Sequence, residues 1–246
     1  MGWNSSLLII ENSNNILDDR AILKAISRGD FQFDRKLNLQ ECIYPDDGSI
    51  NIGHYKGNII ICDDFQITID SLERARTFKL TKEENGLVQL FSNSEIVTVA
   101  CRNLVNYHGY SLIKNGKKIR LKTISAKVPI MEFGPRTREE NKIYESSHQK
   151  EGKNFWKDES DPEQEYTEDQ LMEDFTFGFA QRRLGVLIDH PEGDEVMENV
   201  TFKKYIKRTS KISKFQDKCL KSSRWLLYVL IVLILIFWLI LKTTLF

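Results

Sequence analysis

The chain lacks the motifs that mark the common nucleotide-binding loops and serine hydrolases. It contains no GxGxxG, GxxxxGKS/T or GxSxG pattern, which argues against the usual phosphate loops and against a nucleophile elbow. It has only four cysteines in 246 residues, too scattered for a disulfide framework, so free thiols in a reducing compartment are expected. A hydrophobic content of 41% and a charged content of 28% are typical of a folded protein and exclude wholesale disorder.

The formal net charge of zero hides a segregation of charge along the chain. Residues 201–246 hold ten basic residues and one acidic residue, whereas residues 139–174 hold 13 acidic residues and four lysines. Within this acidic region, residues 146–165 have few apolar side chains apart from Phe155 and Trp156. These residues are predicted to be a polar acidic loop or linker, which we expect to be mobile.

One long uncharged run stands near the C-terminus. Residues 225–241 give 17 positions without a charge, glycine or proline, or about 25 Å of helix, which predicts a short transmembrane helix. Only Lys242 follows the run, whereas many basic residues precede it. The positive-inside rule then places the N-terminal domain in the cytoplasm and the C-terminus outside. The expectation is a single-pass, tail-anchored membrane protein.

Residues 196–224, which precede this run, are predicted to be a basic juxtamembrane helix. Their lysines recur at helical spacing, and such residues next to a membrane are attracted to anionic lipid head groups. A flexible tether that only fixes the topology is the alternative. The neighbouring membrane span argues against nucleic acid as the partner. The predicted membrane-surface residues are Lys203, Lys204, Lys207, Arg208, Lys211, Lys214, Lys218, Lys221 and Arg224.

Residues 1–195 are expected to form one α+β domain. Helical periodicity appears at residues 16–27 and 167–183. The predicted fold is a mixed, mostly antiparallel sheet of six to nine strands, with both helices packed on one face. Apolar or alternating runs predict strands at residues 5–10, 39–44, 50–55, 58–62, 66–70, 87–91 and 96–102.

A hairpin over residues 104–125 is the strongest local prediction. Asn115 and Gly116 form the preferred two-residue loop of a type I′ turn. A loop of this length would place Leu112 opposite Ile119, Tyr110 opposite Leu121 and His108 opposite Thr123. The other face of the hairpin, which is expected to be exposed to water, would then carry Lys118, Arg120 and Lys122.

Several turn and strand motifs together resemble a known bacterial family. They are an opening Met1-Gly2 before an apolar strand, a Tyr44-Pro45-Asp46-Asp47-Gly48 turn, Gly53-His54-Tyr55-Lys56-Gly57, and Ile61-Cys62-Asp63. This pattern resembles a family described only as a domain of unknown function. The resemblance covers residues 1–135 and 167–190, and it implies a bacterial source and a shared fold. With a bacterial source, the expected membrane is the inner membrane of the cell. It implies no catalytic residues and no activity.

A few side chains have the chemistry for a site. Cys42, His54, Cys62, Asp63 and Asp64, with His108 near them, are residue types that bind zinc, and paired carboxylates also serve as acid and base. Their spacing follows strand lengths rather than a metal-binding loop, so small core cysteines, a core histidine and turn aspartates explain them as well. No metal site and no cofactor are therefore predicted.

Two functions remain open from the sequence. The first is a non-enzymatic, membrane-tethered module that binds an unknown protein partner, in addition to the lipid bilayer. The second is a membrane-attached hydrolase or metal-dependent enzyme that uses His54, Asp63, Asp64 and His108. The lack of a recognisable catalytic constellation favours the first.

Overall fold

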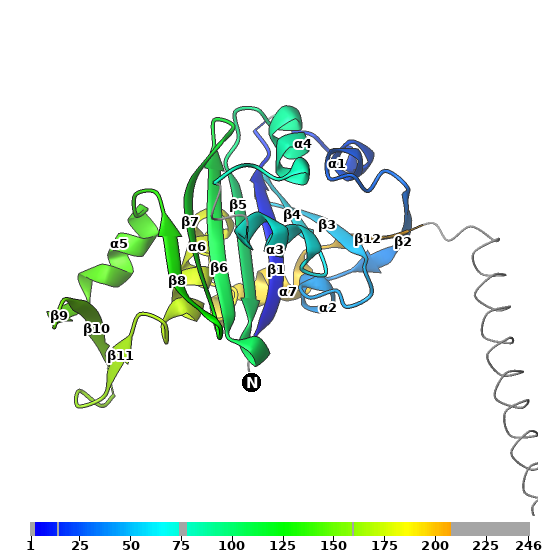
Figure 1. Ribbon diagram of the computed structural model, residues 1–246. Helices are drawn as coiled ribbons and strands as arrows, with labels where there is room; N and C mark the ends of the chain where they lie inside the picture. The colour runs from blue at the N-terminus through cyan, green and yellow to red at the C-terminus, as the bar shows by residue number, and fades with distance from the viewer. Residues whose placement is uncertain (1–2, 14, 74–77, 159, 208–246) are drawn as a thin grey trace, which may run out of the picture. The chain divides into compact units, whose positions relative to one another are not determined.

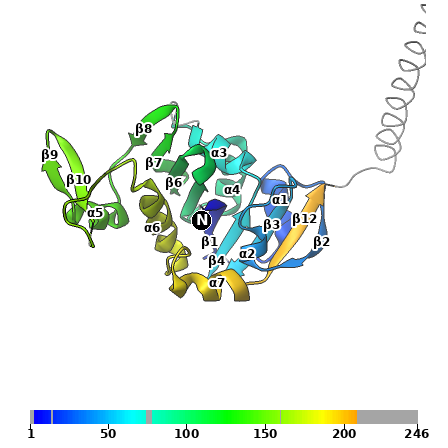
Figure 2. The same ribbon diagram turned by 90° about the horizontal axis from the view of Figure 1, so that it is seen from below.

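The computed structural model describes residues 3–13, 15–73, 78–158 and 160–207 (Figure 1, Figure 2). Residues up to Lys207 form one compact unit. Its described part holds a nine-stranded sheet, a three-stranded sheet and seven α-helices. The predicted α+β class is confirmed. All the described strand pairs are antiparallel, so the sheet is antiparallel rather than mixed.

β1 lies in the middle of the large sheet and is buried from Ser5 to Ile10. Its residues are buried continuously rather than at alternate positions, as is typical of a strand covered on both faces. The strands in sheet order are β2 (Phe31–Leu37), β12 (Phe202–Lys207), β3 (Ile50–Tyr55), β4 (Asn58–Cys62), β1 (Asn4–Glu11), β5 (Ile96–Arg102), β6 (Tyr107–Lys114), β7 (Lys117–Ser125) and β8 (Val128–Phe133).

Helices cover both faces of the large sheet (Figure 2). α1 (Asp19–Ala25), α3 (Gln66–Glu73) and α4 (Lys82–Leu90) pack on the face that carries Leu8 and Ile10. α2 (Leu39–Cys42), α6 (Met172–Leu184) and α7 (Asp194–Asn199) pack on the face of Leu7 and Ile9. The prediction that both long helices share one face is therefore wrong, because the central strands are apolar on both sides.

Three predicted strands, at residues 39–44, 66–70 and 87–91, are helical instead. Reciprocal side-chain caps begin two of these helices, between Asn38 and Glu41 for α2 and between Thr81 and Glu84 for α4. At the third, the carboxylate of Asp63 accepts a hydrogen bond from the Ile67 amide at 2.6 Å. These polar caps outweigh the short apolar runs that suggested strands.

β12 lies between β2 and β3, so the domain extends to Lys207 rather than ending at residue 195. Phe202 and Tyr205 in this strand are buried. The predicted basic helix is therefore wrong over residues 202–207, because two strand neighbours complete the pairing of this segment. No helix among the described residues is long and apolar enough to cross a membrane. The predicted span at residues 225–241 lies outside the described residues.

The β6–β7 hairpin has the predicted Asn115-Gly116 loop, and its first pairs keep the predicted register. A β-bulge then shifts the register by one residue, so that Leu112 lies opposite Arg120 and Tyr110 opposite Lys122. The predicted register is wrong beyond this bulge. The basic side chains are also buried rather than wet, because each has a carboxylate partner inside the fold.

The predicted polar loop or linker at residues 146–165 is wrong for residues 148–150 and 153–157, which form two strands of a second sheet. Its strands are β9 (His148–Lys150), β10 (Lys153–Lys157) and β11 (Glu165–Thr167), in the order β11-β10-β9. Trp156 is buried against Tyr144 and Phe175. Its indole nitrogen donates to the carbonyl of Ile143 at 2.8 Å, in α5 (Arg138–Glu145), which packs on α6. One buried aromatic residue therefore fastens this polar segment to the domain.

Candidate functional site

The residues predicted to form one chemical cluster are divided among separate places. Cys42 and Cys62 are both buried in the core on the α6 face, where burial and the neighbouring Cys42 thiol raise the pKa of Cys62 well above its usual value.

Asp63 is buried at the start of α3, where it also accepts a hydrogen bond from the Ser6 hydroxyl at 2.6 Å. Burial raises the pKa of the Asp63 carboxyl. Asp64 accepts from the side-chain amide of Gln66 at 3.1 Å. These contacts explain the two aspartates as parts of the turn before α3.

His54 belongs to a second polar cluster, around Asp19 at the start of α1. The Asp19 carboxylate lies 3.2 Å from the His54 ring and accepts hydrogen bonds from Lys203 at 2.8 Å and the Tyr205 hydroxyl at 2.7 Å. Burial opposes ionisation, but these three partners lower the pKa of Asp19 to about 2. The cluster joins α1 to β3 and β12, which is a structural role.

The described part of the predicted membrane-surface set is paired with acids. Lys203 bonds to Asp19, Lys204 bonds to Asp47, and the ammonium of Lys207 lies 4.0 Å from Asp30. Lys203 and Lys204 therefore help to hold β12 in the sheet. The other members of that set lie outside the described residues.

His108 meets partners that the sequence analysis did not consider. It lies in β6 directly opposite Cys101 of β5, and Glu173 of α6 lies beside both. One potential ligand atom from each of the three residues, a ring nitrogen, a sulfur and a carboxylate oxygen, lies within 4.8 Å of the others. Burial lowers the pKa of His108. Burial, together with the negative charges of Glu173 and Asp189, raises the pKa of the Cys101 thiol far above its usual value.

This cluster, which we call the Cys-His-Glu cluster, has an unmet hydrogen-bonding atom. His108 is only 5% exposed, and its Nδ1 has no hydrogen-bond partner among the described residues. Asn103 bridges the other two members, because its side-chain oxygen accepts from the Cys101 thiol at 3.0 Å and its amide donates to Glu173 at 2.6 Å. A cavity of about 290 Å³ adjoins the cluster, lined by Asn103, Asn106, His108, Asp169, Gln170 and Glu173.

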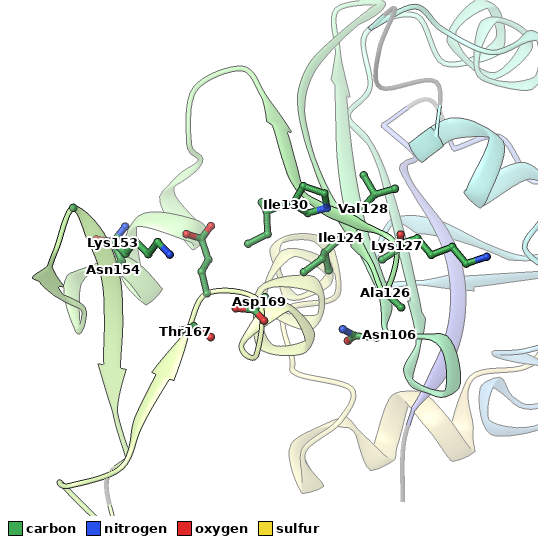
Figure 3. Close-up of a pocket in the computed structure, with 14 residues that line it drawn as sticks. Asn106, Ile124, Ala126, Lys127, Val128, Ile130, Lys153, Asn154, Thr167 and Asp169 are labelled. Atoms are coloured by element: carbon green, nitrogen blue, oxygen red, sulfur yellow. The ribbon is translucent and has the colours of Figure 1, made fainter.

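A larger groove of about 770 Å³ lies between the β7–β8 hairpin and the three-stranded sheet (Figure 3). One wall carries the apolar side chains of Ile124, Val128 and Ile130, and Lys153 and Asn154 stand across from them (Figure 3). Asn106 and Asp169 line both this groove and the smaller cavity, so the two spaces adjoin.

Buried ion pairs fix the wall of the groove. Lys122 of β7 is buried and lies 2.5 Å from Glu168, which lines the groove, and it donates to the Tyr144 hydroxyl at 2.9 Å. The Tyr144 hydroxyl in turn donates to Glu168 at 2.5 Å. Because these contacts run from the large sheet through α5 to the segment after β11, they hold the two sides of the groove at a fixed separation.

A second buried ion pair joins β7 to α5. The Arg120 guanidinium donates to both carboxylate oxygens of Glu140, at 3.0 and 2.9 Å from its Nε. The Tyr110 hydroxyl also donates to Glu140, at 2.7 Å. The sequence analysis missed both pairs because their carboxylates lie in residues 138–168, far from β7 in the chain.

Comparisons with protein-family models, curated proteins and solved structures find no match to this chain.

Proposed function

We propose that this chain is a membrane-tethered binding module whose cytoplasmic domain holds an extended peptide segment of a partner protein. The peptide lies in the groove between β8 and the three-stranded sheet. The observation that carries the proposal is this groove, with its apolar wall of Ile124, Val128 and Ile130 and its rim of charged side chains.

The size and lining of the groove suit a peptide. Its volume of about 770 Å³ falls within the roughly 300–1,000 Å³ of typical ligand sites. Lys127, Lys153 and Asp169 also line the groove, so charged groups of both signs are present for polar contacts. Apolar anchors surrounded by a polar rim are the usual composition of a protein interface.

The edge of the large sheet favours an extended conformation for the peptide. β8 ends the nine-stranded sheet in the described part of the chain, with β7 as its one strand neighbour there. An exposed sheet edge offers unpaired backbone groups, to which an extended segment can add as a further strand. Pro129 near the beginning of β8 removes one donor at this edge, and such prolines limit edge-to-edge self-association.

Membrane attachment rests on the sequence of residues 225–241 and on the basic residues that precede them. An uncharged run of this length with positive charge on its N-terminal side supports a cytoplasmic domain at the inner face of a bacterial cell membrane. Tethering raises the effective concentration of the groove for partners at the same surface.

A peptide selection tests the groove. Random displayed 12-residue peptides are selected on the full chain in lipid nanodiscs, and the affinities of the enriched peptides are then measured. Val128→Asp places a charge on the groove wall and is expected to weaken these peptides at least about tenfold. Ile119→Asp is the matched control, because Ile119 and Val128 are both 37% exposed and Ile119 lies outside the groove lining. Enriched peptides that bind both variants as well as the unchanged chain would contradict the proposal.

A further inference from the structure

We infer that Cys101, His108 and Glu173 form a binding site for a single Zn²⁺ ion. None of these three residues lines the peptide groove, although the cavity beside them adjoins it, and the inference stands whether or not the groove binds a peptide. It rests on the donor types, on their mutual distances, on the unmet His108 nitrogen and on the space beside the cluster.

The donor set matches the preferences of zinc. Thiolate, imidazole and carboxylate are its three usual protein ligands, with bonds of about 2.0–2.3 Å. Ligand atoms around a tetrahedral ion with such bonds stand roughly 3.3–3.8 Å apart. The three atoms here already lie within 4.8 Å of one another, so small side-chain rotations would close the site. Glu173 is the partly exposed member and has the most freedom to move.

The backbone fixes the other two ligands. Cys101 and His108 are opposite residues of the antiparallel β5–β6 pair, which holds both side chains on the same face of the sheet. Glu173 comes from the first turn of α6, which packs on β5 and β6. The three ligands therefore come from rigid elements rather than from a loop, as a preorganised site requires.

The unmet nitrogen of His108 is evidence for a bound ion that does not depend on the distances among the three ligand atoms. Only 5% of His108 is exposed, yet its Nδ1 has no hydrogen-bond partner among the described residues. Buried polar atoms without partners are rare in folded proteins and call for an explanation such as an ion. A zinc ion bound by the His108 ring would bring a positive charge beside Glu173 and Asp189, whose negative charges already act on Cys101.

The surroundings supply an outer shell and an open position. Asn103 accepts from the Cys101 thiol at 3.0 Å and donates to Glu173 at 2.6 Å, so it orients two of the ligands. On zinc binding the thiol loses its proton to solvent and the sulfur bonds to the metal, while the Asn103 bond to Glu173 can remain. The cavity of about 290 Å³ beside the cluster has room for a water as the fourth ligand.

Metal titration of the full chain tests the inference. The chain is purified in detergent micelles, stripped with a chelator and titrated with Co²⁺ as a spectroscopic probe, which Zn²⁺ then displaces. We expect one equivalent of Co²⁺ to bind, with a thiolate-to-cobalt absorption band in the near ultraviolet. Zn²⁺ is also expected to raise the melting temperature of the chain by several degrees.

Two variants assign the site. Glu173→Gln keeps an oxygen that can accept from Asn103 and is expected to weaken Co²⁺ at least about tenfold. His108→Phe removes the unmet nitrogen at similar volume and is expected to abolish binding while the metal-free protein melts no lower than the unchanged chain. Cys42→Ala, at another buried cysteine, is the control and should bind normally.

Two results would overturn the inference. The first is the absence of a thiolate-to-cobalt band in the unchanged chain. The second is a band that persists at full strength in both Glu173→Gln and His108→Phe, which would place the metal at another cysteine.

Discussion

Glu140 is predicted to be the most sensitive carboxylate of the domain. Its side chain and that of Arg120 are each 1% exposed, and both oxygens of Glu140 accept hydrogen bonds. Glu140→Gln turns one of these acceptors into a donor that faces other donors, and it leaves the guanidinium without its main counter-charge. Breaking a buried pair in this way costs about 3–5 kcal/mol. The remaining bond from Arg120 to Glu132 reduces this, so we expect a loss of about 2–4 kcal/mol.

The neighbouring Glu139 provides a matched control. It has the same chemistry, lies in the same first turn of α5, and pairs with Arg182 at 2.9 Å. That pair is more than 20% exposed on both sides, so Glu139→Gln should cost less than about 1 kcal/mol. Any effect of the helix dipole is shared by the two variants.

Thermal unfolding of the chain truncated after Lys207 measures both variants. For a domain of this size, 1 kcal/mol corresponds to roughly 2–4 °C in melting temperature. Glu140→Gln should therefore lower the melting temperature by roughly 4–16 °C, and Glu139→Gln by less than about 4 °C. Equal, small shifts for the two variants would refute the reasoning that the Arg120 pair stabilises the fold through its buried charge.

Three further predictions concern acid stability, backbone packing and membrane attachment. Because Asp19 has a pKa of about 2 in the folded chain against 3.8 ordinarily, its stabilisation is present above about pH 4 and is lost as the pH falls toward 2. Asp19→Asn should thus be less stable than the unchanged domain by about 2 kcal/mol at pH 7 in urea unfolding, and the difference should narrow at pH 2. At Gly134 (φ +80°) a Cβ would stand 1.9 Å from the Ile119 carbonyl oxygen, so Gly134→Ala should lower the stability by over about 2 kcal/mol in the same urea assay. Gly152 is the control, because it has a similar φ of +75° and nothing within 4 Å of an added Cβ, so Gly152→Ala should cost about 1 kcal/mol. In cell fractionation the full chain should remain with membranes in high salt and the chain ending at Lys207 should be released; release of both would contradict a hydrophobic anchor.

Local sequence signals predicted the centre of the fold well. The apolar run at residues 5–10 is β1, and the Asn115-Gly116 loop connects β6 and β7. Predictions failed where distant residues decide the outcome. β12 has the lysine spacing of an amphipathic helix, but pairing with β2 and β3 makes it a strand. The bulge opposite Leu112 accompanies the burial of Arg120 against Glu140, and no local pattern reveals either feature.

The candidate sites show the same division. His108 was recognised as lying on the apolar face of its hairpin, and it is buried there. Its partner Cys101 was missed because only the pairing of β5 with β6 brings the two together. The turn between these strands, at residues 103–106, lacks a two-residue hairpin signal, so the register could not be read in advance. The groove likewise depends on how the small sheet is fastened through Trp156.

Hydrogen exchange with a bound peptide tests the central claim most directly. A peptide enriched on the full chain is added in excess, and backbone amide exchange is followed by mass spectrometry with the chain in nanodiscs. If the peptide adds to the free edge of the large sheet, segments covering β8 (Val128–Phe133) should exchange more slowly. Segments covering β2 (Phe31–Leu37), the strand at the opposite end of the sheet, should be unchanged. Protection at β2 with none at β8 would contradict the account.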